Sequence, residues 1–175
     1  MGQPIEIQAG PDTFRGLLLR RGFGDPTDWH TEGSGRFSLR GDDMLLDAPD
    51  GGSTVFYGHL LPPSVAIQYT VRSQEPWQQN NFNLISHCAP PAPGQWPIVE
   101  GGEYAGYRKM ANYILTFVGD YEKDEWGRNG GQGRTRVRRN PGFDLHQEAH
   151  PRSEYGVDYR IVYAVNNGCI HYYLN

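Results

Sequence analysis

The chain has 175 residues and a formal net charge of −4, with 37% hydrophobic and 13% aromatic residues, 23 Gly and 13 Pro. This length fits one domain and is short for two, and the abundance of Gly, Pro and aromatic residues favours short strands joined by tight turns over long helices. The net negative charge argues against a general nucleic-acid binder, because such proteins need a basic surface that displaces counterions from phosphates.

Strands in the first half of the chain are indicated by alternating or β-rich runs between Gly, Pro and Asp residues. In the clearest run, hydrophobic residues from Val65 to Val71 alternate with Ala66, Gln68, Thr70 and Arg72, which is typical of a strand with one face in the core. The strands predicted here are Gly35 to Leu39, Met44 to Ala48, Thr54 to Leu60, Ser64 to Arg72 and Asn81 to His87.

The middle of the chain is expected to be less regular. The run CAPPAPGQWPIVEGG, from Cys88 to Gly102, contains several Pro residues that lack a backbone donor, so we expect a long crossing loop or lid. Helical character is brief, near Tyr104 to Met110. A strand is predicted over Asn112 to Val118, followed by a polar, Gly-rich loop with a tight turn at Asn129-Gly130.

The last third returns to β structure, beginning with a strand over Arg134 to Arg139. Tyr159 to Val165 and Cys169 to Leu174 flank Asn166-Asn167-Gly168, which predicts a hairpin because Asn and Gly tolerate positive φ. The second hairpin strand runs to Asn175 with no turn after it. We therefore expect a truncated chain that stops before its sheet is complete, and a C-terminal edge strand is the alternative.

Neither the start of the chain nor its cysteines indicate a targeting segment or a cross-link. Residues 1–23 lack the basic and apolar regions of a signal peptide, and no apolar run approaches membrane-spanning length. We expect a cytoplasmic protein as the sequence stands, or a periplasmic or secreted one if a signal peptide has been removed. Cys88 and Cys169 lack CxxC spacing, and we favour two buried thiols over a bridge.

The densest charged feature is RTRVRRNPGF, residues 134–143. On a strand, Arg134, Arg136 and Arg138 share one face, and Arg139 lies on the other face with Thr135 and Val137. One interpretation is a cleft for carboxylates, sulfates or phosphates, because a guanidinium group presents a planar fork of donors. The alternative pairs these arginines with acids of the surrounding loops, such as Asp124, Glu125 or Glu148.

Aromatic and histidine side chains supply further candidates. Flat rings in or beside the predicted loops could stack on sugar rings, and the alternative for each is a core or loop anchor. These rings are Trp77, Trp96, Tyr104, Tyr107, Tyr113, Tyr121 and Trp126. General acid or base candidates are His59, His87, His146 and His171, with His30 and His150 expected in loops. His87 and His146 are the best placed, and a hydrogen-bonded structural role is the alternative for each.

Common catalytic signatures are absent from the sequence. There is no HExxH and no close His pair, so no metal site is predicted, and no P-loop, GxSxG or dinucleotide fingerprint predicts a cofactor. Four acids between Asp120 and Glu125 lie in the Gly-rich segment instead of forming a pair on one strand face. This pattern weakens ordinary double-displacement glycoside hydrolysis.

Four segments in the same order resemble the YesU-like proteins: DWHTEGSGRFSL (28–39), ANYILTFVG (111–119), GRTRVRRNPGFDL (133–145) and DYRIVYAVNNGCIHYYLN (158–175). The most specific part is the Asn-aromatic strand followed by the Arg-rich strand that ends in Arg-Asn-Pro-Gly-Phe. The resemblance implies a concanavalin A-like jelly-roll sandwich of two antiparallel sheets, in bacterial proteins of poorly defined function encoded among genes for degrading acidic glycans. In that family further strands follow the last hairpin, and this sequence lacks them.

Together these features predict one jelly-roll domain over residues 1–175 that acts on uronate-containing poly- or oligosaccharides, with neither nucleic acid nor membrane as a partner. The expected chemistry is β-elimination: an arginine neutralises a uronate carboxylate, and a tyrosine or histidine acts as base. A non-catalytic carbohydrate-binding module, a glycoside hydrolase of unusual mechanism and a structural domain are the alternatives. The predicted catalytic residues are Tyr113, His87 and Tyr107, and the predicted binding residues are Arg134, Arg136, Arg139, Asn112, Trp126 and Tyr104.

Overall fold

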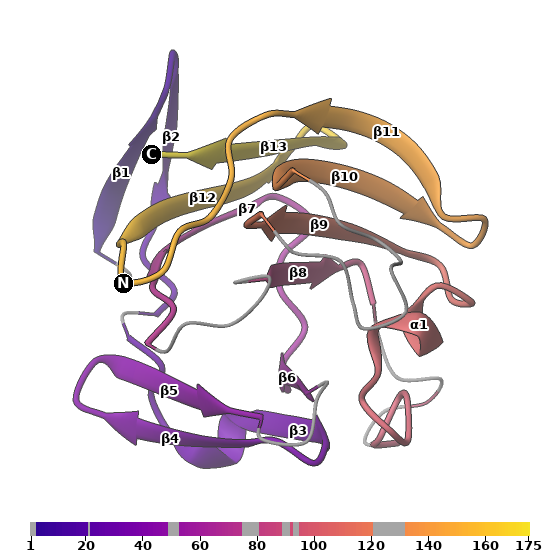
Figure 1. Ribbon diagram of the computed structural model, residues 1–175. Coiled ribbons are helices and arrows are strands. Elements are labelled where there is room, and N and C mark those ends of the chain that lie inside the picture. Colours follow the sequence, from indigo (N-terminus) through magenta and orange to yellow (C-terminus); the bar gives the residue numbers. More distant parts are fainter. Residues whose placement is uncertain are drawn as a thin grey trace.

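Antiparallel strands dominate the fold (Figure 1). The computed structural model describes residues 3–20, 22–48, 53–74, 81–88, 92, 95–120 and 132–175. Within these residues the chain forms an all-β, jelly-roll-like sandwich of antiparallel sheets, with one short α-helix, α1 (Tyr104–Tyr107), and one 3-10 turn, η1 (Pro26–Asp28).

The first large sheet has four strands in the order β11-β10-β9-β8. These strands are β8 (Phe82–Ser86), β9 (Asn112–Val118), β10 (Arg134–Asn140) and β11 (Asp144–Ala149). β9 is central and its apolar run NYILTFV is buried along most of its length, as expected for a strand covered on both faces. β11 is the polar edge strand, and one extra residue, His146, interrupts its pairing with β10 between Val137 and Arg138.

The second large sheet has three strands in the order β13-β12-β7. They are β7 (Val65–Val71), β12 (Tyr159–Asn166) and β13 (Cys169–Leu174). The turn between β12 and β13 places Asn167 at φ 51° and Gly168 at φ 75°, the conformation for which Asn and Gly are suited. The predicted hairpin is confirmed.

The core lies where the two large sheets face each other. Leu115 on β9 packs with Tyr163 and Val165 on β12, and all three side chains are buried. Ile67, Leu84, Val137, Ile170 and Tyr172 surround them at alternate strand positions, so each of these strands turns one of its two faces to this core.

A hairpin of β1 (Pro4–Ala9) and β2 (Asp12–Leu17) lies against the three-stranded sheet. The Tyr173 hydroxyl donates to the Asp12 carboxylate, and the Arg160 guanidinium donates to the Gln8 carbonyl at 2.6 Å. These bonds join the start of the chain to its last two strands, and β13 therefore contacts the hairpin through its side chains.

Two further strand pairs lie in the lower part of Figure 1. β3 (Trp29–Gly33) pairs with β6 (Ser53–Tyr57), and β4 (Arg36–Arg40) pairs with β5 (Asp43–Asp47). Glu32 of β3 is 2% exposed, and its carboxylate accepts hydrogen bonds from the Ile98 and Val99 amides and from the Tyr107 hydroxyl. This buried carboxylate joins β3 to the Pro-rich segment and to α1.

Several sequence predictions are corrected by the structure. Strands β1, β2, β3 and β11 were not predicted, and His30 lies in β3, where it stacks on Trp96 with ring centroids 4.4 Å apart, instead of in a loop. The two cysteines are free, as predicted, but neither is fully buried: Cys88 is partly exposed, and Cys169 is exposed because it begins β13 directly after the hairpin turn. The turn predicted at Asn129-Gly130 lies outside the described residues.

Candidate functional site

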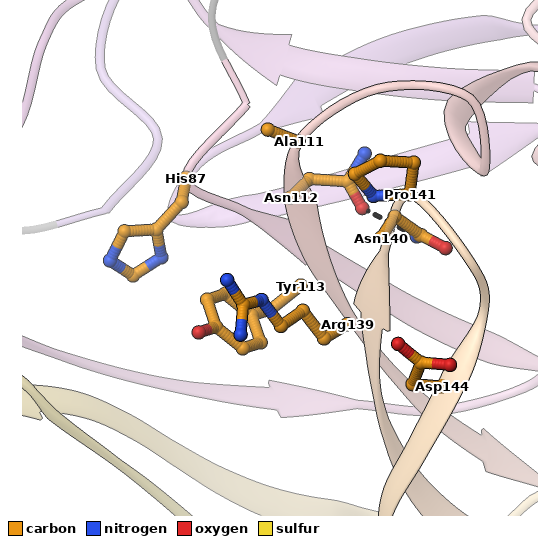
Figure 2. Close-up of a pocket in the computed structure, with 8 residues that line it drawn as sticks. All are labelled: His87, Ala111, Asn112, Tyr113, Arg139, Asn140, Pro141 and Asp144. Atoms are coloured by element: carbon orange, nitrogen blue, oxygen red, sulfur yellow. Dashed lines mark hydrogen bonds between the residues drawn. The ribbon is translucent and has the colours of Figure 1, made fainter.

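A pocket of about 510 Å³ lies where β8, β9 and β10 end, at one end of the four-stranded sheet. Its volume is within the range of sites that hold small ligands. Figure 2 shows its lining, in which the side chains come from β9, from β10, from the first residue of β11, and from residues next to the ends of β8, β9 and β10. The lining residues are His87, Ala111, Asn112, Tyr113, Arg139, Asn140, Pro141 and Asp144.

Strand register places the two central side chains of this pocket on one face of the sheet. Tyr113 on β9 lies directly opposite Ser86 on β8 and opposite Arg139 on β10. Side chains at directly opposite positions project to the same face, so the phenol and the guanidinium are cross-strand neighbours. Tyr113 also packs against the core cluster of Leu115 and Tyr163, which holds its ring in place while its position at the pocket leaves it accessible.

His87 enters the pocket from the end of β8. Its backbone has φ 57°, in the left-handed region that is uncommon for residues other than glycine. The imidazole ring meets the edge of Tyr113 with ring centroids 5.4 Å apart and an interplanar angle of 72°, and its Nδ1 lies 3.3 Å from Ser86 Oγ. This conformation directs an exposed histidine toward the phenol.

Two buried asparagines form the frame behind the pocket. Asn140 Nδ2 donates to Asn112 Oδ1 at 2.8 Å, and Asn112 Nδ2 donates to the carbonyls of Tyr107 and Met110 at 2.7 and 3.2 Å. Because the Asn112 amide is occupied on both sides, its contribution to the pocket is to hold β9, β10 and the segment after α1 together. Asn140 Oδ1 is buried with no hydrogen-bond partner among the described residues.

Beneath the pocket lies the Tyr163 hydroxyl, which is buried and has no hydrogen-bond partner within 3.5 Å among the described residues. Burial raises the pKa of Tyr163, and Ser86 and Tyr113 are its polar neighbours. Behind the pocket lining, a buried neutral phenol therefore lies beside the serine that contacts His87.

The charged groups of the pocket are not neutralised by each other. Arg139 and Asp144 are opposite one another on β10 and β11, yet they form no ion pair, and no carboxylate in the described ranges lies within 4.0 Å of the Arg139 guanidinium. Both residues are exposed. Arg139 can therefore receive the carboxylate of a ligand without first releasing a partner.

The other arginines of β10 have different surroundings. Arg134 and Arg136 bind the same carboxylate, that of Glu148 on β11, at 3.0 and 2.7 Å. These two guanidinium groups, Arg136 foremost, hold the pKa of Glu148 below its usual range. Their contacts correspond to the ion-pair interpretation, and alternation along β10 directs both residues to the face of the sheet opposite Arg139.

Two other predicted site residues, Tyr107 and Tyr104, lie apart from the pocket lining. Tyr107 is fully buried, and burial together with the hydrogen bond to Glu32 raises its pKa. Tyr104 contacts Phe143 in the turn between β10 and β11, with ring centroids 6.0 Å apart. Trp126 lies outside the described residues.

Sequence reasoning did not single out Asn140, Pro141 and Asp144 as site residues. These residues line the pocket only because β10 pairs with both β9 and β11. A signal was present in the run RNPGFD, because a Pro-Gly pair after a strand predicts a turn that brings the following Asp back beside the strand end.

Fold and site together define a jelly-roll-like β-sandwich with a polar, arginine-containing pocket at the end of one sheet. A comparison with models of known protein families gives no match, and no curated protein sequence is significantly similar to this chain. Among the described residues, no three or more His, Cys, Asp or Glu side chains are grouped as metal ligands would be, and no helix is long and apolar enough to cross a membrane.

Proposed function

We propose that this protein binds uronate-containing saccharides in the pocket between β8, β9 and β10 and cleaves them by β-elimination. The observation that carries the proposal is the convergence of His87, Tyr113 and Arg139 on one cavity, with the guanidinium unpaired within the described part of the chain. These are an acid or base, a second acid or base, and a cation suited to a carboxylate.

The roles follow from charge. Arg139 binds the uronate carboxylate and stabilises the negative charge that develops on it when the neighbouring carbon, C5, loses its proton. Either Tyr113 or His87 accepts that proton, and the other donates a proton to the departing glycosidic oxygen on C4. The C5–H and C4–O bonds break, a C4–C5 double bond forms, and the products are an unsaturated uronate and a new chain end.

Two observations bear on this chemistry. The first favours it over double-displacement hydrolysis by a carboxylate pair, and the second limits which side chains act as acid and base. Asp144 is the sole carboxylate among the described residues that line this pocket, whereas hydrolysis of that kind needs two acids, one on either side of the bond. The Tyr107 phenol is buried and donates a hydrogen bond to the Glu32 carboxylate, so it does not reach the pocket. The acid and base roles therefore fall on Tyr113 and His87.

A second candidate is a non-catalytic carbohydrate-binding module that uses the same pocket. It is favoured by the exposure of His87, Arg139 and Asp144, because catalytic charges work best where water is excluded. In that case the aromatic ring of Tyr113 and the arginine would supply affinity alone.

The test is incubation of the protein with oligosaccharides of pectic, alginate and ulvan type, followed by ultraviolet absorbance for unsaturated uronates, with thermal shift measured in parallel. New absorbance that is lost in Tyr113→Phe and kept in Tyr155→Phe, an exposed tyrosine outside the pocket lining, supports the lyase. A thermal shift without product identifies the binding module, and the absence of both overturns the proposal.

A further inference from the structure

A second group of cations lies just beyond the pocket, around the turn that joins β10 to β11. The ring of Phe143 in this turn is contacted by two guanidinium groups: the Arg108 carbon lies 4.0 Å from the ring centroid, and the Arg138 carbon lies 4.2 Å from it. Arg108 also lies 4.7 Å from the centroid of Tyr104, whose ring meets Phe143 edge to face.

These two arginines differ from Arg134 and Arg136 in having no carboxylate partner among the residues that the structure describes. Within the described ranges the Arg138 side chain donates one hydrogen bond, to the Phe143 carbonyl at 3.1 Å, and the Arg108 side chain makes ring contacts but no hydrogen bond or ion pair. Because both guanidinium carbons lie within 4.2 Å of the same ring centroid, the two cations are close to each other and repel. An anion bound between them would relieve that repulsion and use their remaining N–H donors.

The position of this group relative to the pocket suggests its ligand. Asn140, Pro141 and Asp144 of the same turn line the pocket, so the turn that carries Phe143 forms the pocket rim. Arg138 and Arg139 are consecutive on β10 and project to opposite faces. Each side of the strand end therefore has one guanidinium group with no carboxylate partner among the described residues. A polyanionic chain that occupies the pocket would meet the second pair of arginines as it passes over this turn.

We infer that Arg108 and Arg138, held by Phe143 and Tyr104, form a second anion-binding subsite that takes the carboxylate of a neighbouring uronate in the same saccharide chain. This inference rests on the proposed function. Planar guanidinium groups that are already stacked on aromatic rings lose little side-chain freedom on binding a carboxylate, and Tyr104 adds a ring on which a sugar could pack.

Arg108→Ala is the sharpest variant, because Arg108 is exposed and its side chain makes no hydrogen bond to any other described residue that the substitution would remove. Its matched control is Arg40→Ala, an exposed arginine at the end of β4 in another part of the molecule. The probes are oligogalacturonates of two and of six residues. We expect Arg108→Ala to weaken binding of the longer probe about tenfold and of the shorter one less than about twofold, because one charge-assisted contact is lost only when a second uronate is present.

Side-chain N–H resonances of arginine, followed by NMR during titration with the six-residue probe, separate the two proposals. Shifts at Arg108, Arg138 and Arg139 together support the subsite. Shifts at Arg139 alone overturn the subsite and leave the pocket standing. Shifts at Arg108 and Arg138 without Arg139 support anion binding at the turn while the proposed function of the pocket fails, and equal weakening of both probes by Arg108→Ala overturns the second subsite.

Discussion

The side chain of Asn140 is hydrogen-bonded to that of Asn112, with Asn140 Nδ2 2.8 Å from Asn112 Oδ1, and both residues are 3% exposed. This bond adds a side-chain link where the backbone pairing of β9 and β10 ends. The side-chain NH2 group of Asn112 in turn donates to the carbonyls of Tyr107 and Met110, which extends the link to the segment after α1. The rear wall of the pocket is therefore one hydrogen-bonded unit.

Replacing Asn112 with Ala should disrupt this unit. The change leaves the Asn140 N–H group and the Tyr107 carbonyl without their partners in a buried place, and we expect the free energy of unfolding to fall by roughly 2–4 kcal/mol. Urea unfolding measures the loss. Asn83→Ala is the control, since Asn83 is an exposed residue of β8 with one hydrogen bond to Thr116; equal losses in the two variants would contradict the role given to Asn112.

Replacement of different arginines of β10 should have different effects on activity. Arg139→Ala removes the unpaired cation of the pocket, and we expect kcat/KM on a uronate substrate to fall about a hundredfold or more with little change in stability. Arg136→Ala should lower it at most a few-fold, since Arg136 is bound to Glu148 on the other face of the strand. Steady-state kinetics of both variants, with Arg40→Ala as the surface control, give the comparison; a larger effect at Arg136 would contradict the assignment.

Glu32 should be important for stability although it lies outside the pocket lining. Glu32→Gln replaces a carboxylate oxygen, which accepts from the Ile98 and Val99 amides and the Tyr107 hydroxyl, by an N–H donor that faces those donors. We expect a loss of roughly 1–3 kcal/mol in the free energy of unfolding, measured in urea. Glu6→Gln, in an exposed pair with Arg15, should cost less than about 1 kcal/mol.

The Glu148 carboxylate predicts a change in stability with pH. Arg136 and Arg134 lower its pKa in the folded protein below the ordinary value of 4.5. Stabilisation from this group is therefore fully present above that ordinary pKa and is lost as the pH falls through the lower, folded value. Thermal unfolding of the natural protein and of Glu148→Gln should differ more at pH 7 than at pH 3; a constant difference would show that the ion pairs contribute nothing through this titration.

Much of the fold could be predicted because strong local signals coincide with the tertiary pattern. The strands at Asn112–Val118 and Cys169–Leu174 are predicted with their observed bounds, since each is rich in β-branched and aromatic residues and lies next to a turn or loop signal in the sequence. β11 was missed because DLHQEA is a polar, exposed edge strand whose hydrogen bonds to β10 hold it in place, and its sequence has no apolar face to reveal it.

The candidate site divides in a similar way. His87, Asn112, Tyr113 and Arg139 were selected from their positions at predicted strand ends, and the structure brings all four to one pocket. Asp144 could not be placed, because its position depends on how β11 pairs with β10. Tyr107 was selected as a site residue but lies outside the pocket lining. Its sequence neighbours resemble those of a loop aromatic, and the carboxylate that binds its hydroxyl comes from a strand 75 residues earlier in the chain.

The extra residue in β11 has a consequence for how this site could tolerate change. His146 interrupts the regular pairing between Val137 and Arg138, and the irregularity is on the edge strand, while β10 keeps an unbroken register with β9. A one-residue length change within β10 would exchange the faces to which Arg138 and Arg139 project, and so move Arg139 away from Tyr113 and out of the pocket. A length change in β11 would instead be absorbed at the margin of the sheet, so insertions and deletions should be accepted there and excluded one strand further in.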